Sequence, residues 1–472
     1  DALDYRERAP LAAGRDMYLD SSGQVIEGLS RRGALAAGVP GTVAGMQAAY
    51  DKYSQLKDWK ALLGPAIRYA AEGFNISQTE ADRLNRFQEE FREFNETPNP
   101  FIRDSFYAGY LLKQPELANT LRAIQQYGKN GFYEGATARA ITMEMKDKGG
   151  LITAEDLAEY EPAWRAPVLF NYHNYRIIGM PPSSSGGVAL SQMLGMIEPF
   201  HLKEYEFHSP AAVHLMVEAE RRAYADRARY LGDSDFYEVP VDSLISEDYL
   251  ASRMETFQPG QASNSDQVAA GAFRVLKESF ETTHTSIVDA DGQAVSVTTT
   301  LNSNYGCKIW VRSGGFFLNN EMDDFSAKPG VPNQFGLLGS EANAIAPGKR
   351  MLSSMTPTII ESNDQLYMVL GAPGGSTIIT AVYQVFLNVA EFGMSLEDAV
   401  NAGRFHHQWL PDEILMEAGA LPDSTVQALR GMGHQFREIE RMAVIKAIHR
   451  EEDGLLRAAG DPRNPDDDAR GY

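Results

Sequence analysis

The sequence contains a single cysteine, Cys307, so no disulfide bond can form within the chain. Disulfides persist mainly in oxidising compartments, but their absence alone does not place a protein in the cytosol. The cysteine count therefore leaves the cellular compartment open, and we expect Cys307 to be a buried, inert thiol.

Long apolar segments are also absent. No stretch approaches the roughly 18 to 20 uninterrupted apolar residues that a membrane-spanning helix requires. The first residues, DALDYRERAP, lack the basic start and the apolar run of a signal peptide. We therefore expect the chain as given to be soluble and to have no membrane span.

The chain has fewer positively charged than negatively charged residues. Lys and Arg number 43 against 64 Asp and Glu, which gives a formal net charge of -21. Such a chain repels phosphate backbones and anionic membrane surfaces. Nucleic acid is therefore not an expected partner.

The chain does have enough apolar material for one large or two ordinary cores, with 472 residues of which 43% are hydrophobic. Its first half is mainly helical in pattern. In HSPAAVHLMVEAERRAYADRARYLG, Ser209 can cap a helix, Pro210 suits the first turn and Gly232 ends the run. Apolar residues recur there every three or four positions, so we predict a core helix and assign it no chemistry.

From residue 282 the pattern changes to β. HTSIVDA and QAVSVTTTL flank the Asp-Gly pair at 291–292, a strong signal for a two-residue hairpin turn. That turn would place Thr282 opposite Leu301, whose neighbours on the second strand are Thr300 and Asn302. A one-residue bulge would shift this register. Hydroxyls and an amide thus collect near Thr282, although threonine-rich strands are also typical of an ordinary β surface.

Farther on, TPTIIES and LYMVLGAP indicate two apolar strands joined by a turn at residues 363–364, with a helix from Ser376. Between strand and helix, Gly374 and Gly375 allow backbone N–H groups to approach a ligand and stabilise an oxyanion. A tight turn is the alternative interpretation. A nucleotide-binding P-loop is disfavoured because no Lys follows the glycines.

Three histidines, His284, His406 and His407, invite a metal or a Ser-His interpretation. His406 and His407 are adjacent, so their side chains do not naturally converge, and no third ligand follows at the spacing of a metal site. We therefore expect structural roles for them and no metal.

Four ordered motifs carry a family resemblance: TTHTSIVDADGQAVSVTTTLN, LNNEMDDFSAKPGVPN, GKRMLSSMTPTI and GAPGGSTIIT. Upstream, YRERAP, GVPGTVAG, GGLITAEDLAEY, MPPSSSGG and AYADRARYLGD agree, as do RFHHQWLPDE and GDPRNPDDDARGY near the C-terminus. Over essentially its whole length the chain resembles the γ-glutamyltranspeptidase family of N-terminal-nucleophile hydrolases. The resemblance implies that the family's first segment is missing, because the chain begins a few residues before the Arg6 motif.

The resemblance implies a precursor that cleaves itself between Glu281 and Thr282. The products would be a large piece, residues 1–281, and a small catalytic piece, residues 282–472. The freed α-amino group of Thr282, with an unperturbed pKa of about 7.7 to 8.0, would act as the base for its own hydroxyl. Thr300 would orient or polarise that hydroxyl.

The remaining site residues also follow from the resemblance. A γ-glutamyl head group is a zwitterion, which needs one clamp for its anion and one for its cation. The residues implied for the α-carboxylate are Arg6, Ser353 and Ser354. Those implied for the α-ammonium are Asn302, Glu321 and Asp324. Those whose main-chain N–H groups would stabilise the oxyanion are Gly374 and Gly375.

Residues 324–352 are rich in Gly, Pro and Asn and lack regular periodicity, which is typical of a functional or disordered loop. We expect this loop to be a lid over the acceptor pocket, with Phe335 near its tip, where the family often carries Tyr. The lid would influence how the γ-glutamyl ester on Thr282 is resolved. Water gives hydrolysis, and the amine of an amino acid or dipeptide gives transpeptidation.

The fold implied is α+β, a four-layer αββα sandwich of two mostly antiparallel sheets covered by helices. The two pieces would share one core as a heterodimer. The implied partners are small γ-glutamyl donors such as glutathione and amino acid or dipeptide acceptors. No cofactor and no metal are expected, and family habit implies a periplasmic or secreted location.

Two alternatives remain open. One is a related acylase of the same superfamily that acts on glutaryl (cephalosporin-type) side chains or on poly-γ-glutamate; Glu321 and Asp324 favour a donor with a free α-amino group instead. The other is a non-maturing homologue that only binds γ-glutamyl groups. Retention of Thr282 and Thr300 argues against it.

Overall fold

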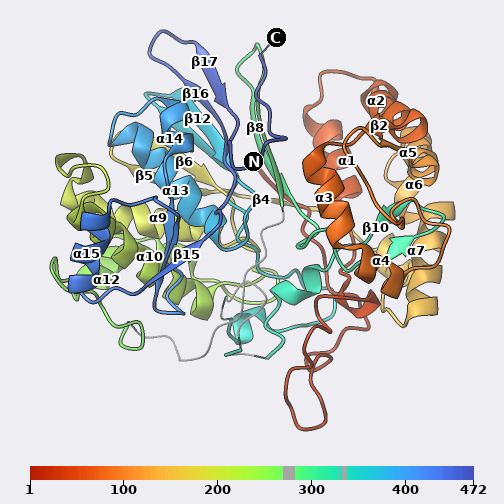
Figure 1. Ribbon diagram of the computed structural model, residues 1–472, viewed down its shortest axis with the longest axis horizontal. Coiled ribbons are helices and arrows are strands. Elements are labelled where there is room, and N and C mark those ends of the chain that lie inside the picture. The colour runs from red at the N-terminus through yellow and green to blue at the C-terminus, as the bar shows by residue number, and fades with distance from the viewer. Residues whose placement is uncertain (269–281, 329, 332–336, 338, 472) are drawn as a thin grey trace.

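The computed structural model describes residues 1–268, 282–328, 330–331, 337 and 339–471. Two regions lie side by side (Figure 1). Helices from the first third of the chain form one region, and an antiparallel sheet with its covering helices forms the other. The predicted combination of α and β layers is therefore confirmed at this coarse level.

A six-stranded antiparallel sheet with the order β17-β16-β12-β11-β6-β5 forms the centre of the layered region. Its strands are β5 (Val168–Tyr172), β6 (Tyr175–Gly179), β11 (Thr358–Ser362), β12 (Gln365–Gly371), β16 (Lys446–Arg450) and β17 (Leu456–Ala459). Asn363 and Asp364 join β11 to β12 with φ values of 53° and 58°, as a type I′ turn requires. This confirms the predicted strand pair and its turn.

The two faces of this sheet are covered differently. Met368 and Leu370 of β12 belong to the buried cluster that contains α9 (Gly186–Ile197) and α13 (Thr377–Ala390). Neighbouring strand residues point to opposite faces. On the other face, a Cβ added to Gly371 would lie 2.2 Å from the His284 ring. His284 belongs to the hairpin of β7 (Thr283–Val288) and β8 (Ala294–Thr299), so this hairpin covers the second face.

The hairpin forms where the sequence predicted it, but the predicted register was wrong by one residue. Thr283 pairs with Thr299 and Val288 with Ala294. The backbone N–H of Asp289 donates to the carbonyl of Gln293, which leaves a three-residue loop in which Gly292 has a φ of 80°. Three-residue loops that end in a left-handed glycine add one residue to the turn. Continued by one step, this register brings Thr300, not Leu301, opposite Thr282.

The predicted core helix is α10 (Pro210–Tyr230), and the Ser209 side chain accepts a hydrogen bond from the backbone N–H of Ala212 as expected. The helix is buried continuously over residues 212–228, charged side chains included. The apolar pattern thus located the helix correctly, but it did not indicate that its polar face is also covered.

The remaining helices lie mostly around the edges of the two regions (Figure 1). Those of the N-terminal region are α1 (Thr42–Tyr53), α2 (Trp59–Glu72), α3 (Gln78–Arg86), α4 (Gln88–Phe94), α5 (Pro115–Tyr127), α6 (Asn130–Tyr133), α7 (Gly135–Lys148) and α8 (Ala154–Ala158). Those of the second region are α11 (Val241–Leu244), α12 (Glu247–Met254), α14 (Leu396–Asn401) and α15 (Asp423–Gly431). Across the described ranges, we find no helix with the length and apolar character to cross a membrane.

Short strands complete the structure. They are β1 (Ala2–Asp4), β2 (Phe74–Asn75), β3 (Leu111–Leu112), β4 (Ala163–Arg165), β9 (Trp310–Val311), β10 (Phe316–Phe317), β13 (Phe405–His406), β14 (Ile414–Glu417) and β15 (Phe436–Ile439). β1 pairs with β4, and this pairing fixes the backbone just before Arg6.

Candidate active site

Two threonine hydroxyls meet at the open end of the hairpin. Thr282 precedes β7 and Thr300 follows β8, and Thr282 Oγ1 donates to Thr300 Oγ1 at 3.4 Å. The Thr300 oxygen also accepts a hydrogen bond of 2.7 Å from the backbone N–H of Asn302. Asn302 has a φ of 70°, a left-handed conformation that asparagine tolerates better than most residues. The bend after β8 thus fixes the hydroxyl that faces Thr282.

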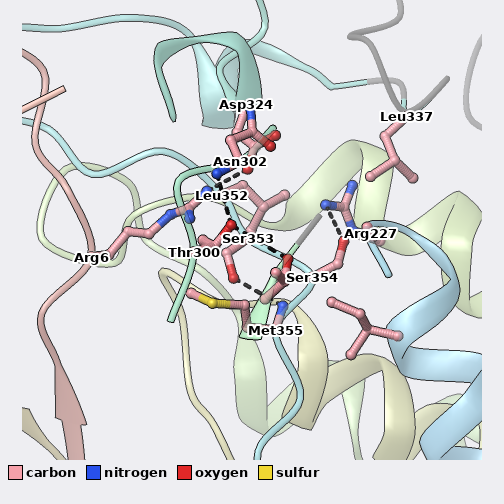
Figure 2. A pocket seen from close by; sticks show the side chains of 13 residues that line it. Arg6, Arg227, Thr300, Asn302, Asp324, Leu337, Leu352, Ser353, Ser354 and Met355 are labelled. Atoms are coloured by element: carbon pink, nitrogen blue, oxygen red, sulfur yellow. Dashed lines mark hydrogen bonds and ion pairs between the residues drawn. The ribbon is translucent and has the colours of Figure 1, made fainter. Parts of the chain in front are cut away.

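A pocket opens beside this pair (Figure 2). It is lined by Arg6, Arg227, Thr282, Thr300, Asn302, Asp324, Leu337, Leu352, Ser353, Ser354, Met355, Gly375 and Ile378. The structure therefore gathers most of the predicted site residues around one space, from positions spread over nearly the whole chain.

Arg6 and two acids form the charged end of the pocket. Arg6 Nη1 lies 2.6 Å from Glu321 Oε2, and Arg6 Nη2 pairs with Asp324. Both acids belong to a single-turn 3₁₀ helix, Glu321–Asp324, in which residues three apart lie on the same side. This spacing explains why both reach the same guanidinium.

The carboxyl groups outnumber the cation at this end. Burial raises the pKa of Asp324 to about 6, although the Arg6 guanidinium acts to lower it. Burial also raises the pKa of Glu321, and it raises that of Glu7, 3.9 Å from Arg6, to about 7. Three carboxyl groups around one guanidinium favour the binding of a further cation.

Gly374 and Gly375 connect β12 to α13, with φ values of 143° and 56°. The backbone N–H and the hydroxyl of Thr377 donate to the Gly374 carbonyl at 3.1 and 2.8 Å, which fixes this turn. Gly375 lines the pocket just before the N-terminus of a 14-residue helix. Backbone N–H groups at such a position favour negative charge.

Among the described residues, two of the predicted site residues are not part of the pocket lining. Glu321 is fully buried behind Arg6, and Gly374 lies behind Gly375 against Ala443. Glu281 and Phe335 fall outside the described residues. Their proposed roles therefore stay predictions.

The structure adds one charged residue that the sequence pattern missed, Arg227 of α10 (Figure 2). It is 3% exposed, and its Nη2 donates to Ser354 Oγ at 3.1 Å. The motif AYADRARYLGD contains it, but the three- and four-residue apolar spacing indicated only a core helix. The signal that could have found it is the presence of charged residues in a segment predicted to be a core helix.

The three histidines are buried and contact neighbouring side chains. His284 Nδ1 lies 2.7 Å from Thr298 Oγ1, and His406 Nδ1 lies 2.8 Å from Thr380 Oγ1. Burial lowers the pKa of His284 and His406 to about 3 and that of His407 to about 4. Neutral, hydrogen-bonded rings of this kind support the structure around them.

One cluster in the described part of the chain has the residue types of a metal site, namely His214, Glu218 and His434, with ligand atoms within 4.8 Å of one another. The His214 and His434 rings hydrogen-bond each other at 2.8 Å, and Glu218 pairs with Arg221 and Arg222. His214 also contacts the Gln258 carbonyl through its second ring nitrogen, so both of its nitrogens are engaged, and the two guanidinium groups repel a cation. We therefore assign no metal to it.

Comparison with known proteins decides the family. The family model described as Gamma-glutamyltranspeptidase matches residues 1–471. The chain belongs to the γ-glutamyltranspeptidase family. The glutathione hydrolase proenzyme of Escherichia coli K12 is 43% identical over 100% of this chain and 81% of its own length. That of Pseudomonas aeruginosa is 45% identical over 98% of this chain and 82% of its own length.

Solved structures place the fold in the same group. A γ-glutamyltranspeptidase from Helicobacter pylori matches with a TM-score of 0.55 and 43% identity, over 57% of this chain and 77% of that one. A cephalosporin acylase from Bacillus halodurans matches with a TM-score of 0.81 and 24% identity, over 100% of this chain and 85% of that one. The second similarity shows the fold alone. The resemblance read from the sequence motifs is thus confirmed, and this γ-glutamyltranspeptidase family member has the mixed helix and strand fold of such enzymes.

Proposed function

We propose that this chain is the precursor of a glutathione hydrolase and γ-glutamyltransferase that cleaves itself between Glu281 and Thr282. The observation that carries the proposal is the position of the Thr282 and Thr300 hydroxyls in one pocket with a charged clamp for a zwitterion. Family members named glutathione hydrolase proenzyme, 43% and 45% identical over nearly the full chain, support it.

In the proposed reaction, the Thr282 hydroxyl attacks the γ-carbonyl of the donor and the freed α-amino group of Thr282 takes its proton. Backbone N–H groups at Gly374 and Gly375 stabilise the oxyanion. Collapse of the tetrahedral intermediate breaks the γ-amide bond of the donor, and the proton passes from the Thr282 amine to the leaving amine. The γ-glutamyl ester on Thr282 is then attacked by water or by the amine of an amino acid or dipeptide. Phe335 in the proposed lid loop influences which of these two nucleophiles reacts.

The clamp sets the donor class. Arg6, Ser353 and Ser354 receive the α-carboxylate. Asn302 and Asp324 receive the α-ammonium, and Glu321 holds Arg6 in place from behind. This arrangement matches a donor with a free amino acid end, such as glutathione.

The two proposed pieces, residues 1–281 and 282–472, stay together as a heterodimer in one core. Strand β6 of the first pairs with strand β11 of the second along five residues in the middle of the sheet, which supports this arrangement. The helices on one face of the six-stranded sheet and the hairpin on its other face support the proposed αββα sandwich. A periplasmic or secreted location is part of the same proposal and rests on the habit of the family.

Comparing two donors tests the function and separates it from the acylase alternative, which the family evidence does not favour. We expect the protein to release a chromophore from a γ-glutamyl anilide about 10- to 150-fold faster, in kcat/KM, than from the glutaryl anilide. The second compound lacks only the α-ammonium, and a hydrogen-bonded charge of this kind contributes about 1.5 to 3 kcal/mol. Equal rates, or a preference for glutaryl, would indicate an acylase, and an uncut chain that releases neither chromophore would indicate the non-maturing binding homologue.

The pH dependence of kcat/KM provides a further prediction. Because burial raises the pKa of Asp324 to about 6, this carboxyl becomes neutral below that pH and loses its attraction for the α-ammonium. For the γ-glutamyl anilide we expect kcat/KM to fall below this value by a further factor of about ten per pH unit, in addition to the fall caused by protonation of the Thr282 amine. The pH profile of kcat/KM for the glutaryl anilide should lack this acid limb. The profiles of both donors should fall as the Thr282 amine becomes protonated. An identical acid limb for both donors would contradict the role of Asp324.

A further inference from the structure

Arg227 differs from Arg6 in the way its charge is compensated. Arg6 lies within 4.0 Å of three carboxyl groups, those of Glu7, Glu321 and Asp324. Within the described ranges, no carboxylate lies within 4.0 Å of Arg227. Its hydrogen bonds go to two neutral hydroxyls, Ser185 Oγ at 2.9 Å and Ser354 Oγ at 3.1 Å. A buried cation without an anion is costly unless a ligand supplies the negative charge.

The titration of Arg227 agrees with this geometry. Burial lowers its pKa to about 10, and the more distant Tyr224 and Asp324 offset only part of that effect. The group remains charged at neutral pH, and its Nη1 amino group has no acceptor among the residues that the structure describes.

The hydrogen-bond direction at Ser354 is set by Arg227. A guanidinium only donates, so Ser354 Oγ must accept from it, and the Ser354 proton points elsewhere. Ser354 Oγ has no other partner within the described residues, and Ser354 lines the pocket. Its O–H is therefore available to an anion in the pocket.

Arg227 also reaches the neighbouring serine. Its Nε donates to Ser185 Oγ, which in turn donates to the Ser353 carbonyl at 2.7 Å. The backbone N–H of Ser185 donates to the same carbonyl at 2.9 Å. Figure 2 shows Arg6 and Arg227 on opposite sides of the two serines. One arginine thus fixes both the peptide of Ser353 and the hydroxyl of Ser354.

We infer that Arg227 is a positioning residue for the α-carboxylate of the donor: it orients the Ser354 hydroxyl toward that carboxylate and supplies behind it a positive charge that no described carboxylate contacts. The inference rests on the proposed function, from which the identity of the donor is taken. The inference assigns chemistry to helix α10, and it predicts that selectivity for an α-carboxylate depends on a residue of the large piece outside the Arg6 motif.

Calorimetric binding of two ligands tests the inference without requiring turnover. L-Glutamate carries the α-carboxylate, and 4-aminobutyrate lacks it. We expect Arg227→Met to weaken the binding of glutamate by about 10- to 100-fold and that of 4-aminobutyrate by less than about threefold. Arg227→Lys, which keeps the charge but loses the paired contacts to Ser185 and Ser354, should lie between wild type and Arg227→Met.

Controls separate positioning from a general structural effect. Arg229→Met alters an exposed arginine on the same helix and should leave both affinities unchanged. In a Ser354→Ala background, the effect of Arg227→Met on glutamate should shrink, because contacting residues are not additive. Equal weakening of both ligands, or full additivity with Ser354→Ala, would overturn the inference.

Kinetics then distinguish the two proposals. In matured enzyme, Arg227→Met should raise KM for the γ-glutamyl anilide about 10- to 100-fold with a much smaller change in kcat. If Arg227→Met does not fold, the ratio of the two affinities in Arg227→Lys decides. If wild type binds glutamate through Arg227 but turns over no γ-glutamyl anilide, the proposed function fails and the inference stands.

Discussion

Thr282→Ala should leave the chain as one uncut, inactive polypeptide. The wild type is expected to yield pieces of residues 1–281 and 282–472, and intact mass spectrometry after incubation would detect both. Without the Thr282 hydroxyl there is no nucleophile for the cleavage or for the acyl transfer. Removal of a nucleophile from a comparable triad lowers kcat by a factor on the order of 10⁶.

The matched control for this variant is Thr285→Ala. Thr285 lies on the same strand, β7, with an exposed side chain, and it does not line the pocket. This variant should mature and release the chromophore like the wild type. Processing of Thr282→Ala to a fragment that begins at residue 282, or activity of that variant on a γ-glutamyl anilide, would show that another residue is the nucleophile.

Gly374→Ala should have the second largest effect, because no side chain fits at this position. An added Cβ would lie 2.5 Å from both Cα and Cβ of Ala443, and the φ of 143° is strained for any other residue. The turn must therefore shift, and with it the N–H groups proposed to bind the oxyanion. The loss of one such donor lowers kcat by about 10²- to 10³-fold.

The measurement is kcat for the γ-glutamyl anilide, corrected for the matured fraction by intact mass. Gly64→Ala is the control, because Gly64 lies within α2, has no atom within 4 Å of an added Cβ and has an ordinary φ. It should keep full activity and gain about 0.5 to 1 kcal/mol of stability, since alanine favours a helix over glycine. Unchanged kcat in matured Gly374→Ala would refute the assignment of the oxyanion site.

Local signals in the sequence located the elements that hold the site. The Asn-Asp pair at 363–364 marked the turn between β11 and β12, and Ser209 marked the start of α10. These features depend on neighbouring residues and on backbone sterics, so they follow from a single stretch of sequence.

The register of the hairpin is a feature that the local sequence does not determine. The same Asp-Gly pair suits a two-residue and a three-residue loop, and these differ by one residue in register. Contacts with the sheet fix the observed register: Ser296 Oγ donates to the Leu370 carbonyl and accepts from the Thr358 backbone N–H, both at 3.0 Å. Only this register places Thr300 opposite Thr282.

The sequence by itself determined the family, the nucleophile candidate and the residue types of a zwitterion clamp, because these are carried by ordered motifs. Only the tertiary structure decided which charges are compensated. Arg6 meets Asp324 across 318 positions of the chain, whereas the hydrogen bonds of Arg227 to described residues go to two hydroxyls. The reason is physical: burial and long-range contacts set the partners and the pKa of a charged side chain, and neither is encoded in the spacing of its neighbours along the chain.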